Sequence, residues 1–172
     1  MLTPGQSTPD LSAPLLGGGR WELTAQSPDT FTVIVFYRGH HCPICKSYLA
    51  DLEAKLDAFA ERGAQVLAIS MDGEARARAT WDEVGLSRLP LAHDMTRQQA
   101  MAWNLYLSGR REGSQEPEVF SEPGLAVLRA DGTLFFTQVQ NAPFTRPPLD
   151  ELLKGLSFVT KNDYPTRGTW HE

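Results

Sequence analysis

One segment limits the fold of this chain more than any other: an apolar strand that leads directly into a Cys-x-x-Cys motif and then into a helix. Residues 31–36 are apolar at nearly every position, which is typical of a strand buried on both faces. Apolar residues then recur at helical spacing from Cys45 to about Gly63, and residues 65–71 form a second apolar run. Strand, helix and strand in this order predict the right-handed parallel crossover unit of an α/β protein.

Shorter elements surround this unit. Hydrophobic spacing, capping signals and turn residues predict three further helices, over 73–84, 96–107 and 147–159, and four further strands, over 21–25, 89–92, 125–128 and 133–139. We therefore expect an α/β fold in which a central mixed sheet of about five strands carries helices on both faces. The expected division is an irregular N-terminal arm over 1–20, one domain over 21–160 and a C-terminal tail over 161–172.

Composition excludes several classes of function. The 172 residues carry a net charge of −5, which would not attract nucleic acid or an anionic membrane. The first residues lack the pattern of a signal peptide, and no apolar run is long enough to span a bilayer. Two cysteines close together cannot form the disulfide framework of a small secreted domain. We expect a cytoplasmic protein.

The motif Cys42-Pro43-Ile44-Cys45 contains both cysteines of the chain. The first lies at the helix start, where unpaired backbone N–H groups and the helix dipole stabilise a thiolate. The second lies one turn further in, on the apolar stripe. We therefore expect Cys42 to be open to solvent and to attack a substrate sulfur. Cys45 would then release the product by closing an intramolecular disulfide.

Cationic and titratable residues crowd the same loop. Arg38, His40 and His41 precede the motif directly, and a cation beside a thiol lowers its pKa. Two loop histidines are also commonly just solvated, so their role in tuning the thiol stays open.

The motif has two other interpretations. The cysteines could be small buried hydrophobic residues, or they could bind zinc. A structural zinc site needs four ligands, and only His40 or His41 with His93 or His171 could complete the set. Adjacent histidines on so short a loop cannot both reach a metal held by the two cysteines without strain. We expect redox chemistry, with neither a metal nor another cofactor.

Several segments, from about residue 21 to near the end of the chain, resemble the peroxiredoxin-like branch of the alkyl hydroperoxide reductase/thiol-specific antioxidant (AhpC/TSA) family, which has the thioredoxin fold. They are Tyr37–Lys46, Pro90–Asp94, Ser121–Gly124, Asp131-Gly132 and Tyr164–Gly168. The resemblance implies an antioxidant enzyme of cell redox homeostasis. It also leaves a homodimer open, since relatives commonly associate.

Three positions depart from true peroxiredoxins. In that family a Thr or Ser and a Pro precede the peroxidatic cysteine, and a later Arg helps to hold the peroxide. With Cys45 aligned to that cysteine, these positions hold Cys42, Arg38 and Pro123. A complete CxxC resembles thioredoxin instead, as does Pro123 where thioredoxin-fold oxidoreductases have a cis-proline. Pro123 would then shape the substrate groove together with Pro43, although a strand-entry proline is the simpler alternative.

These arguments favour a thiol-based oxidoreductase that exchanges disulfides, with Cys42 leading. The alternative is a thiol peroxidase that reduces hydroperoxides, in which the peroxiredoxin register would make Cys45 lead. A non-catalytic redox sensor or binding module is the third reading. Either enzyme needs a disulfide or hydroperoxide substrate and an external thiol reductant. We expect the polar stretch 108–118, with Arg110 and Arg111, to border the site, and the tail from Asn162 to Gly168 to dock on the body or on a second subunit.

Overall fold

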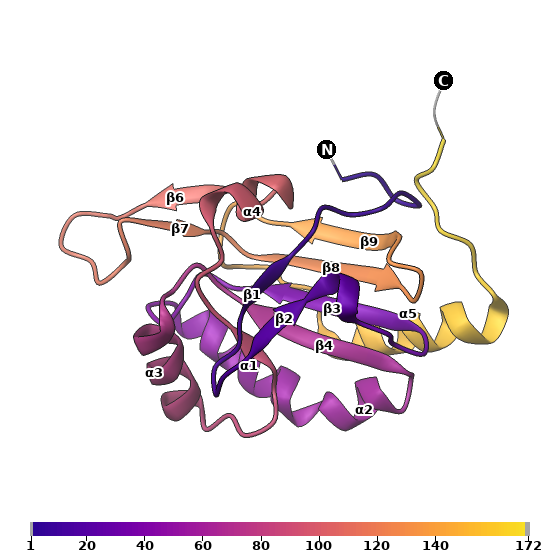
Figure 1. The fold of residues 1–172 in the computed structure, drawn as a ribbon, viewed down its shortest axis with the longest axis horizontal. Helices are drawn as coiled ribbons and strands as arrows, with labels where there is room; N and C mark the ends of the chain where they lie inside the picture. Colours follow the sequence, from indigo (N-terminus) through magenta and orange to yellow (C-terminus); the bar gives the residue numbers. More distant parts are fainter. Residues whose placement is uncertain (1, 171–172) are drawn as a thin grey trace.

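The computed structural model describes residues 2–170 (Figure 1). The helices are α1 (Pro43–Ala54), α2 (Leu56–Ala60), α3 (Glu74–Val84), α4 (Arg97–Ala102) and α5 (Leu149–Asn162), with a 3-10 turn at Leu23–Ala25. The strands are β1 (Ser12–Pro14), β2 (Arg20–Glu22), β3 (Phe31–Phe36), β4 (Ala64–Ile69), β5 (Leu91–Ala92), β6 (Leu107–Gly109), β7 (Val119–Ser121), β8 (Gly124–Arg129) and β9 (Leu134–Val139). No helix of residues 2–170 is long and apolar enough to cross a bilayer.

A five-stranded sheet in the order β5-β4-β3-β8-β9 forms the centre of the molecule. β3 lies in the middle, parallel to β4 and antiparallel to β8, and every one of its six residues is buried. Helices α1, α2, α3 and α5 cover one face, while α4 and the β1–β2 pair cover the other (Figure 1). The predicted α/β fold with a central mixed sheet and helices on both faces is confirmed.

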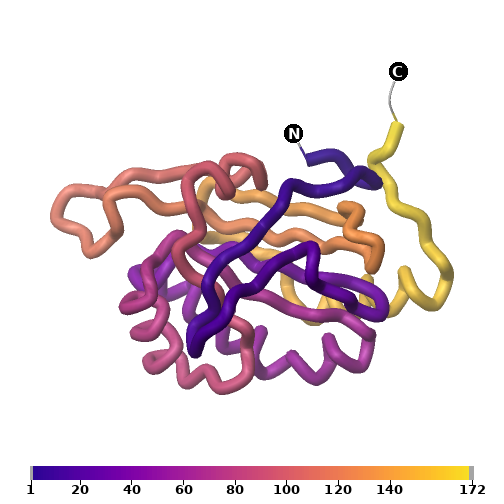
Figure 2. Tube along the Cα trace, viewed as in Figure 1, coloured from indigo at the N-terminus to yellow at the C-terminus, as the bar shows by residue number. Residues whose placement is uncertain are grey.

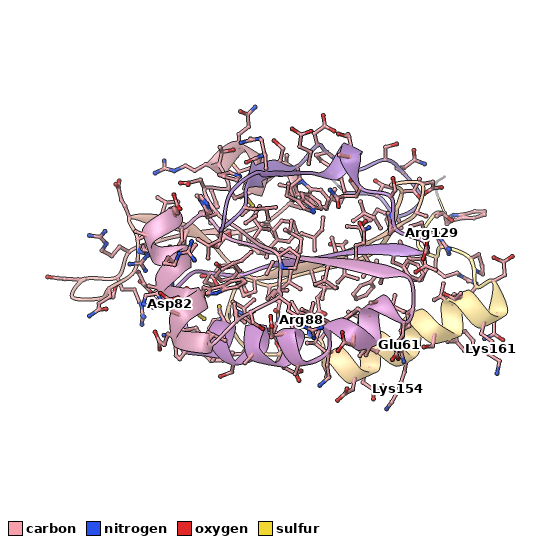
Figure 3. All side chains as sticks on the ribbon, turned by 60° about the horizontal axis from the view of Figure 1, so that its bottom comes forward. Glu61, Asp82, Arg88, Arg129, Lys154 and Lys161 are labelled. Atoms are coloured by element: carbon pink, nitrogen blue, oxygen red, sulfur yellow. The ribbon has the colours of Figure 1, made fainter. Side chains whose placement is uncertain are left out.

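Apolar side chains from β3 alternate between the two cores. Val33 and Val35 pack with the apolar stripe of α1, which includes Cys45, whereas Ile34 and Phe36 face Trp103 and the opposite layer. Charged side chains such as Arg88 and Lys154 project outward (Figure 3). The end of β3 is therefore held from both sides, and this fixes where the following loop begins.

The N-terminal arm is more ordered than the predicted irregular segment. β1 pairs antiparallel with β2, and Leu11 and Ala13 are buried in the core. Short strands of three residues leave almost no periodic signal in a sequence, which explains why the arm was not recognised.

Both termini run along the same end of the molecule (Figure 2). The N–H of Gly5 donates to the carbonyl of Leu134, at the start of β9. On the other side, Arg129 donates to the carbonyl of Tyr164 and to the hydroxyl of Thr166. The prediction that the tail docks on the body is thus confirmed as far as the described residues extend.

Two predicted helices end earlier than expected. The helix after the CxxC is interrupted at Lys55, which separates α1 from α2. The predicted capping box of Thr96 and Gln99 is present, but α4 stops at Ala102 because Trp103 turns into the core and Asn104 adopts a positive φ of 62°. The polar stretch that follows forms the β6–β7 hairpin, which projects from the body (Figure 1).

Candidate functional site

The CxxC lies where sequence analysis placed it, at the N-terminus of α1. Cys42 is the N-cap residue, Pro43 is the first helical residue, and Cys45 follows in the first turn. Proline suits that first position because it has no N–H to leave unpaired. The Cys42 sulfur accepts a hydrogen bond from the backbone N–H of Cys45 at 3.3 Å. A side chain that caps its own helix in this way is aimed at the positive end of the helix dipole.

Cys42 is not open to solvent, contrary to expectation. Its exposed fraction is 1%, and that of Cys45 is 0%. The reason is the cap itself: the Cys42 side chain turns inward over the first turn, so that Pro43 and Ile44 occupy the exposed positions of the motif. Both cysteines are free thiols. With so little exposed surface, the sulfurs meet a reactant only after at least a small local movement of the residues around the motif.

The two sulfurs have opposite acid–base properties. Hydrogen bonds from the Cys45 thiol and the Cys45 backbone N–H, with the positive charges of Arg146 and Arg38, lower the pKa of Cys42 to about 6, against the effect of burial. Burial raises the pKa of Cys45, and the neighbouring Cys42 raises it further. A thiolate at Cys42 beside a protonated Cys45 is the arrangement in which the Cys42 sulfur attacks the substrate and the Cys45 sulfur reacts only in the later, resolving step.

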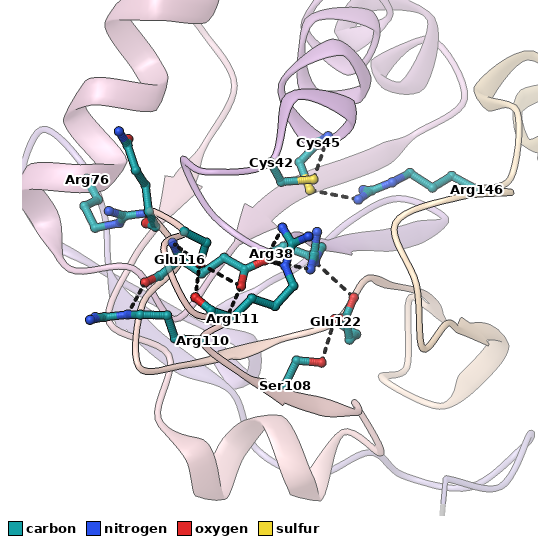
Figure 4. A network of polar contacts seen from close by, with 12 residues as sticks. Arg38, Cys42, Cys45, Arg76, Ser108, Arg110, Arg111, Glu116, Glu122 and Arg146 are labelled. Carbon is teal, nitrogen blue, oxygen red and sulfur yellow. Dashed lines mark hydrogen bonds and ion pairs between the residues drawn. The ribbon is translucent and has the colours of Figure 1, made fainter.

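Arg146 is a residue of the site that sequence analysis missed. Its Nη2 donates to the Cys45 sulfur at 2.8 Å (Figure 4). Its guanidinium also lies 5.3 Å from the centre of the Tyr48 ring. The loop between β9 and α5 presents it: Gln140 donates to the carbonyl of Thr145, and Tyr48 donates to that of Pro147 at 2.8 Å. The lone arginine before the Pro-Pro helix start was the only local signal.

Arg38 faces two buried carboxylates rather than solvent. Its Nε lies 3.1 Å from Oε2 of Glu122, and its Nη2 lies 3.6 Å from Oε1 of Glu116. Its guanidinium also lies 4.8 Å above the Phe120 ring. Sequence analysis named Arg38 but did not connect it with its partners, Glu116 in the loop between β6 and β7 and Glu122 directly after β7.

The two loop histidines do not supply charge to the thiols. Burial, followed by the charge of Arg38, lowers the pKa of His41 to about 4, so this imidazole is neutral near pH 7. Its ring packs edge-on against Phe120 at 4.7 Å. His40 turns toward α3, where its Nδ1 lies 3.3 Å from the hydroxyl of Thr80 and its Nε2 lies 3.7 Å from Glu83. The idea of a histidine cation lowering the thiol pKa is wrong for His41.

Pro123 differs from the expectation in two ways. Residues 2–170 contain no cis peptide bond, so the bond before Pro123 is trans. Pro123 is buried between β7 and β8, and it does not line either cavity beside the cysteines. Since Gly124 already pairs with Phe36 in the sheet, Pro123 has the ordinary role of a strand-entry proline.

Two cavities flank the motif. One of about 430 Å³ is lined by Arg38, His41, Pro43 and, from the polar stretch, Arg111 and Glu116. The other, of about 320 Å³, lies between the motif and the loop that carries Arg146. The prediction that the polar stretch borders the site is confirmed for Arg111. Arg110, in contrast, donates to the carbonyl of Glu116 and stabilises the hairpin.

Metal ligands do not assemble around the cysteines. Within residues 2–170 there is no group of three or more His, Cys, Asp or Glu side chains placed to hold an ion. His93 is buried and contacts Asp94, with 2.7 Å between Nδ1 and Oδ2. His171 lies outside the described residues.

Gly39 allows the loop before the motif to approach the segment between β4 and α3 closely. Its φ is +123°, and a Cβ there would lie 2.6 Å from the Asp72 carboxylate, which accepts the N–H of His40. We expect Gly39→Ala to lower the free energy of unfolding by about 2 kcal/mol or more, measured by urea denaturation. Gly113→Ala is the matched control, with a φ of +71° and open space around the Cβ. If Gly39→Ala and Gly113→Ala lower the free energy of unfolding by the same amount, the contact with Asp72 is unimportant.

Comparisons with known proteins agree with this geometry. The model of the AhpC/TSA family matches residues 4–136. No curated protein matches the chain. The reduced 2-Cys peroxiredoxin of Plasmodium vivax superposes with a TM-score of 0.78 at 21% identity, over 95% of this chain and 84% of that one. AhpC of Mycobacterium bovis superposes with a TM-score of 0.75 at 18% identity, over 99% of both chains. Peroxiredoxin 6 of Arenicola marina superposes with a TM-score of 0.77 at 16% identity, over 95% of this chain and 76% of that one.

The structural likenesses show that the fold is the thioredoxin fold in the form that peroxiredoxins share. The family model covers most of the chain, including β3, the CxxC and the sheet up to β9. The resemblance found in the sequence is thereby confirmed, and this chain belongs to the AhpC/TSA family of thiol-based oxidoreductases.

Proposed function

We propose that the protein catalyses thiol–disulfide exchange with Cys42 as the nucleophile and Cys45 as the resolving thiol. The observation that carries this proposal is the pair of oppositely perturbed thiols at one helix N-terminus. The Cys42 thiolate attacks one sulfur of a substrate disulfide, forms a mixed disulfide and expels the other sulfur as a thiolate. Cys45 then gives its proton to the substrate thiolate released in the first step or to water, attacks the Cys42 sulfur and expels the second substrate sulfur as a thiolate. An external dithiol reduces the resulting Cys42–Cys45 disulfide.

Burial of both sulfurs favours a second candidate, reduction of a hydroperoxide. A small oxidant can enter the flanking cavities, whereas a protein disulfide needs the motif to open. Here the Cys42 thiolate attacks the terminal peroxide oxygen and becomes a sulfenic acid, while the O–O bond breaks and the alkoxide leaves with a proton from water. Cys45 attacks the sulfenic sulfur, and the disulfide forms as water is lost.

The charges around the pair suit either reaction. Arg38 and Arg146 both favour the thiolate at Cys42, and Arg146 contacts the sulfur on which charge develops during resolution. A cycle in which an external dithiol reduces the disulfide fits a reducing compartment such as the cytoplasm, and a homodimer is compatible with it.

Side-by-side turnover with hydrogen peroxide, an organic hydroperoxide and a protein disulfide tests the proposal. With a dithiol reductant in excess, we expect many equivalents of at least one oxidant to be consumed per protein. Disulfide turnover well above peroxide turnover supports the first candidate, and the reverse supports the second. Consumption that stops near one equivalent with all three oxidants contradicts both and indicates a sensor.

A further inference from the structure

The β6–β7 hairpin reaches the candidate site through two buried carboxylates. The side chains of Glu116 and Glu122 are 2% and 4% exposed, and both point toward Arg38 (Figure 4). A buried carboxylate is costly unless it is paired and hydrogen-bonded, so such residues need a reason to be there.

Residues of the β6–β7 hairpin hold both carboxylates in place. The hydroxyl of Ser108 donates to Oε1 of Glu122 at 2.7 Å, which leaves Oε2 facing Arg38. The backbone N–H of Arg111 donates to Oε2 of Glu116 at 2.9 Å, and its Nε donates to Oε1 at 3.0 Å. Within residues 2–170, neither Oε2 of Glu122 nor Nε of Arg38 makes a hydrogen bond, and the two atoms meet as an ion pair at 3.1 Å. Glu122 therefore acts on Arg38 from a fixed position.

Arg38 lies between the carboxylates and the sulfurs (Figure 4). Its side chain is 14% exposed, with the Phe120 ring against its guanidinium. Arg38 is one of the groups that lower the pKa of Cys42. An arginine side chain that is not held samples many rotamers, so the carboxylates decide how long the guanidinium stays near the sulfur.

We propose that Glu122 is a positioning residue that holds the Arg38 guanidinium beside Cys42. Ser108 anchors Glu122, and Glu116 assists it. Through these contacts the β6–β7 hairpin sets the reactivity of the Cys42 sulfur. The inference rests on the proposed function in that Cys42 is the nucleophile. The proposal predicts the direction in which loss of Glu122 changes the ionisation of Cys42. The negative charge of Glu122 alone would disfavour a thiolate nearby, whereas its hold on Arg38 favours one.

Two variants separate these effects. Ser108→Ala removes the anchor of Glu122 without changing any charge, and Glu122→Gln removes the ion pair. Glu118→Gln makes the same charge change at an exposed position of the same hairpin and is the matched control. Ionisation is followed by thiolate absorbance, and alkylation by iodoacetamide is assigned to each cysteine by mass spectrometry. For both variants, we expect ionisation at higher pH and Cys42 alkylation slower by roughly threefold to tenfold at about pH 6, with no change in the control.

Several outcomes of these measurements would contradict the proposal. If the ionisation profile of Cys42 is unchanged in Ser108→Ala, or if it moves to lower pH in Glu122→Gln, Glu122 does not have the positioning role. If Glu122→Gln does not fold, as judged by circular dichroism, Ser108→Ala decides, because it leaves every charge in place. If the wild-type protein is alkylated first at Cys45, the proposed nucleophile itself is wrong. If it is alkylated first at Cys42 and neither variant shifts the profile, only the positioning role is wrong.

Discussion

Cys45→Ser is expected to trap a covalent intermediate on Cys42, while Cys42→Ser is expected to lose the reaction almost entirely. In Cys45→Ser the attacking sulfur keeps its helix cap and both arginines, but the resolving thiol is gone. A mixed disulfide, or a sulfenic acid after peroxide, should therefore accumulate. In Cys42→Ser the remaining thiol is fully buried and protonated, and we expect turnover to fall by roughly a thousandfold or more.

Intact-protein mass spectrometry after one equivalent of oxidant distinguishes the two variants directly. The expected mass increase in Cys45→Ser corresponds to half of the substrate disulfide, or to one oxygen atom. Rapid reaction of Cys42→Ser with hydroperoxide, together with its loss in Cys45→Ser, would support the peroxiredoxin register, in which Cys45 leads. The assignment of roles proposed above would then be wrong.

Arg146→Met is the second change for which we expect a large effect. It removes the cation that contacts the Cys45 sulfur at 2.8 Å and helps to lower the pKa of Cys42. Loss of a nearby positive charge raises a thiol pKa, so the thiolate fraction near pH 7 falls and is regained as the pH rises. We expect the alkylation of Cys42 and the closure of the disulfide both to slow by about tenfold.

A matched set of variants tests the role of this guanidinium. Arg146→Lys retains the charge and should recover part of the rate, although a lysine cannot stack on Tyr48 in the same manner. Arg97→Met removes an exposed arginine at the start of α4 and should change nothing. Stopped-flow measurement of disulfide closure across pH provides the comparison. A profile of Arg146→Met that superposes on that of the wild type would exclude an electrostatic role.

The sequence predicts those parts of the molecule that are encoded by neighbouring residues. β3, α1, β4 and the β8–β9 hairpin follow from periodicity and turn residues, and the position of Cys42 at a helix start follows from the same local pattern. The short strand β1 and the break at Lys55 do not, because tertiary packing rather than local preference decides them.

The site itself was only partly predictable. Arg146 lies 101 residues beyond Cys45, and Glu122 reaches Arg38 from the linker between β7 and β8, so no spacing in the sequence connects either pair. Burial also reversed two expectations. Cys42 is covered because it caps its own helix, and His41 is neutral because it is taken out of water. Desolvation depends on what packs around a side chain, and this is known only once the chain has folded.

The cap that Cys42 makes on α1 also has a thermodynamic consequence for the oxidised state. The N–H of Cys45 and the two guanidiniums interact most favourably with a negatively charged sulfur, and a disulfide carries no charge. These contacts therefore stabilise the dithiol form more than the disulfide form. Stabilising the reduced state moves the reduction potential in the positive direction, so that the disulfide becomes a better electron acceptor. The geometry that activates Cys42 therefore also shifts the equilibrium with a dithiol donor toward the reduced form of the protein.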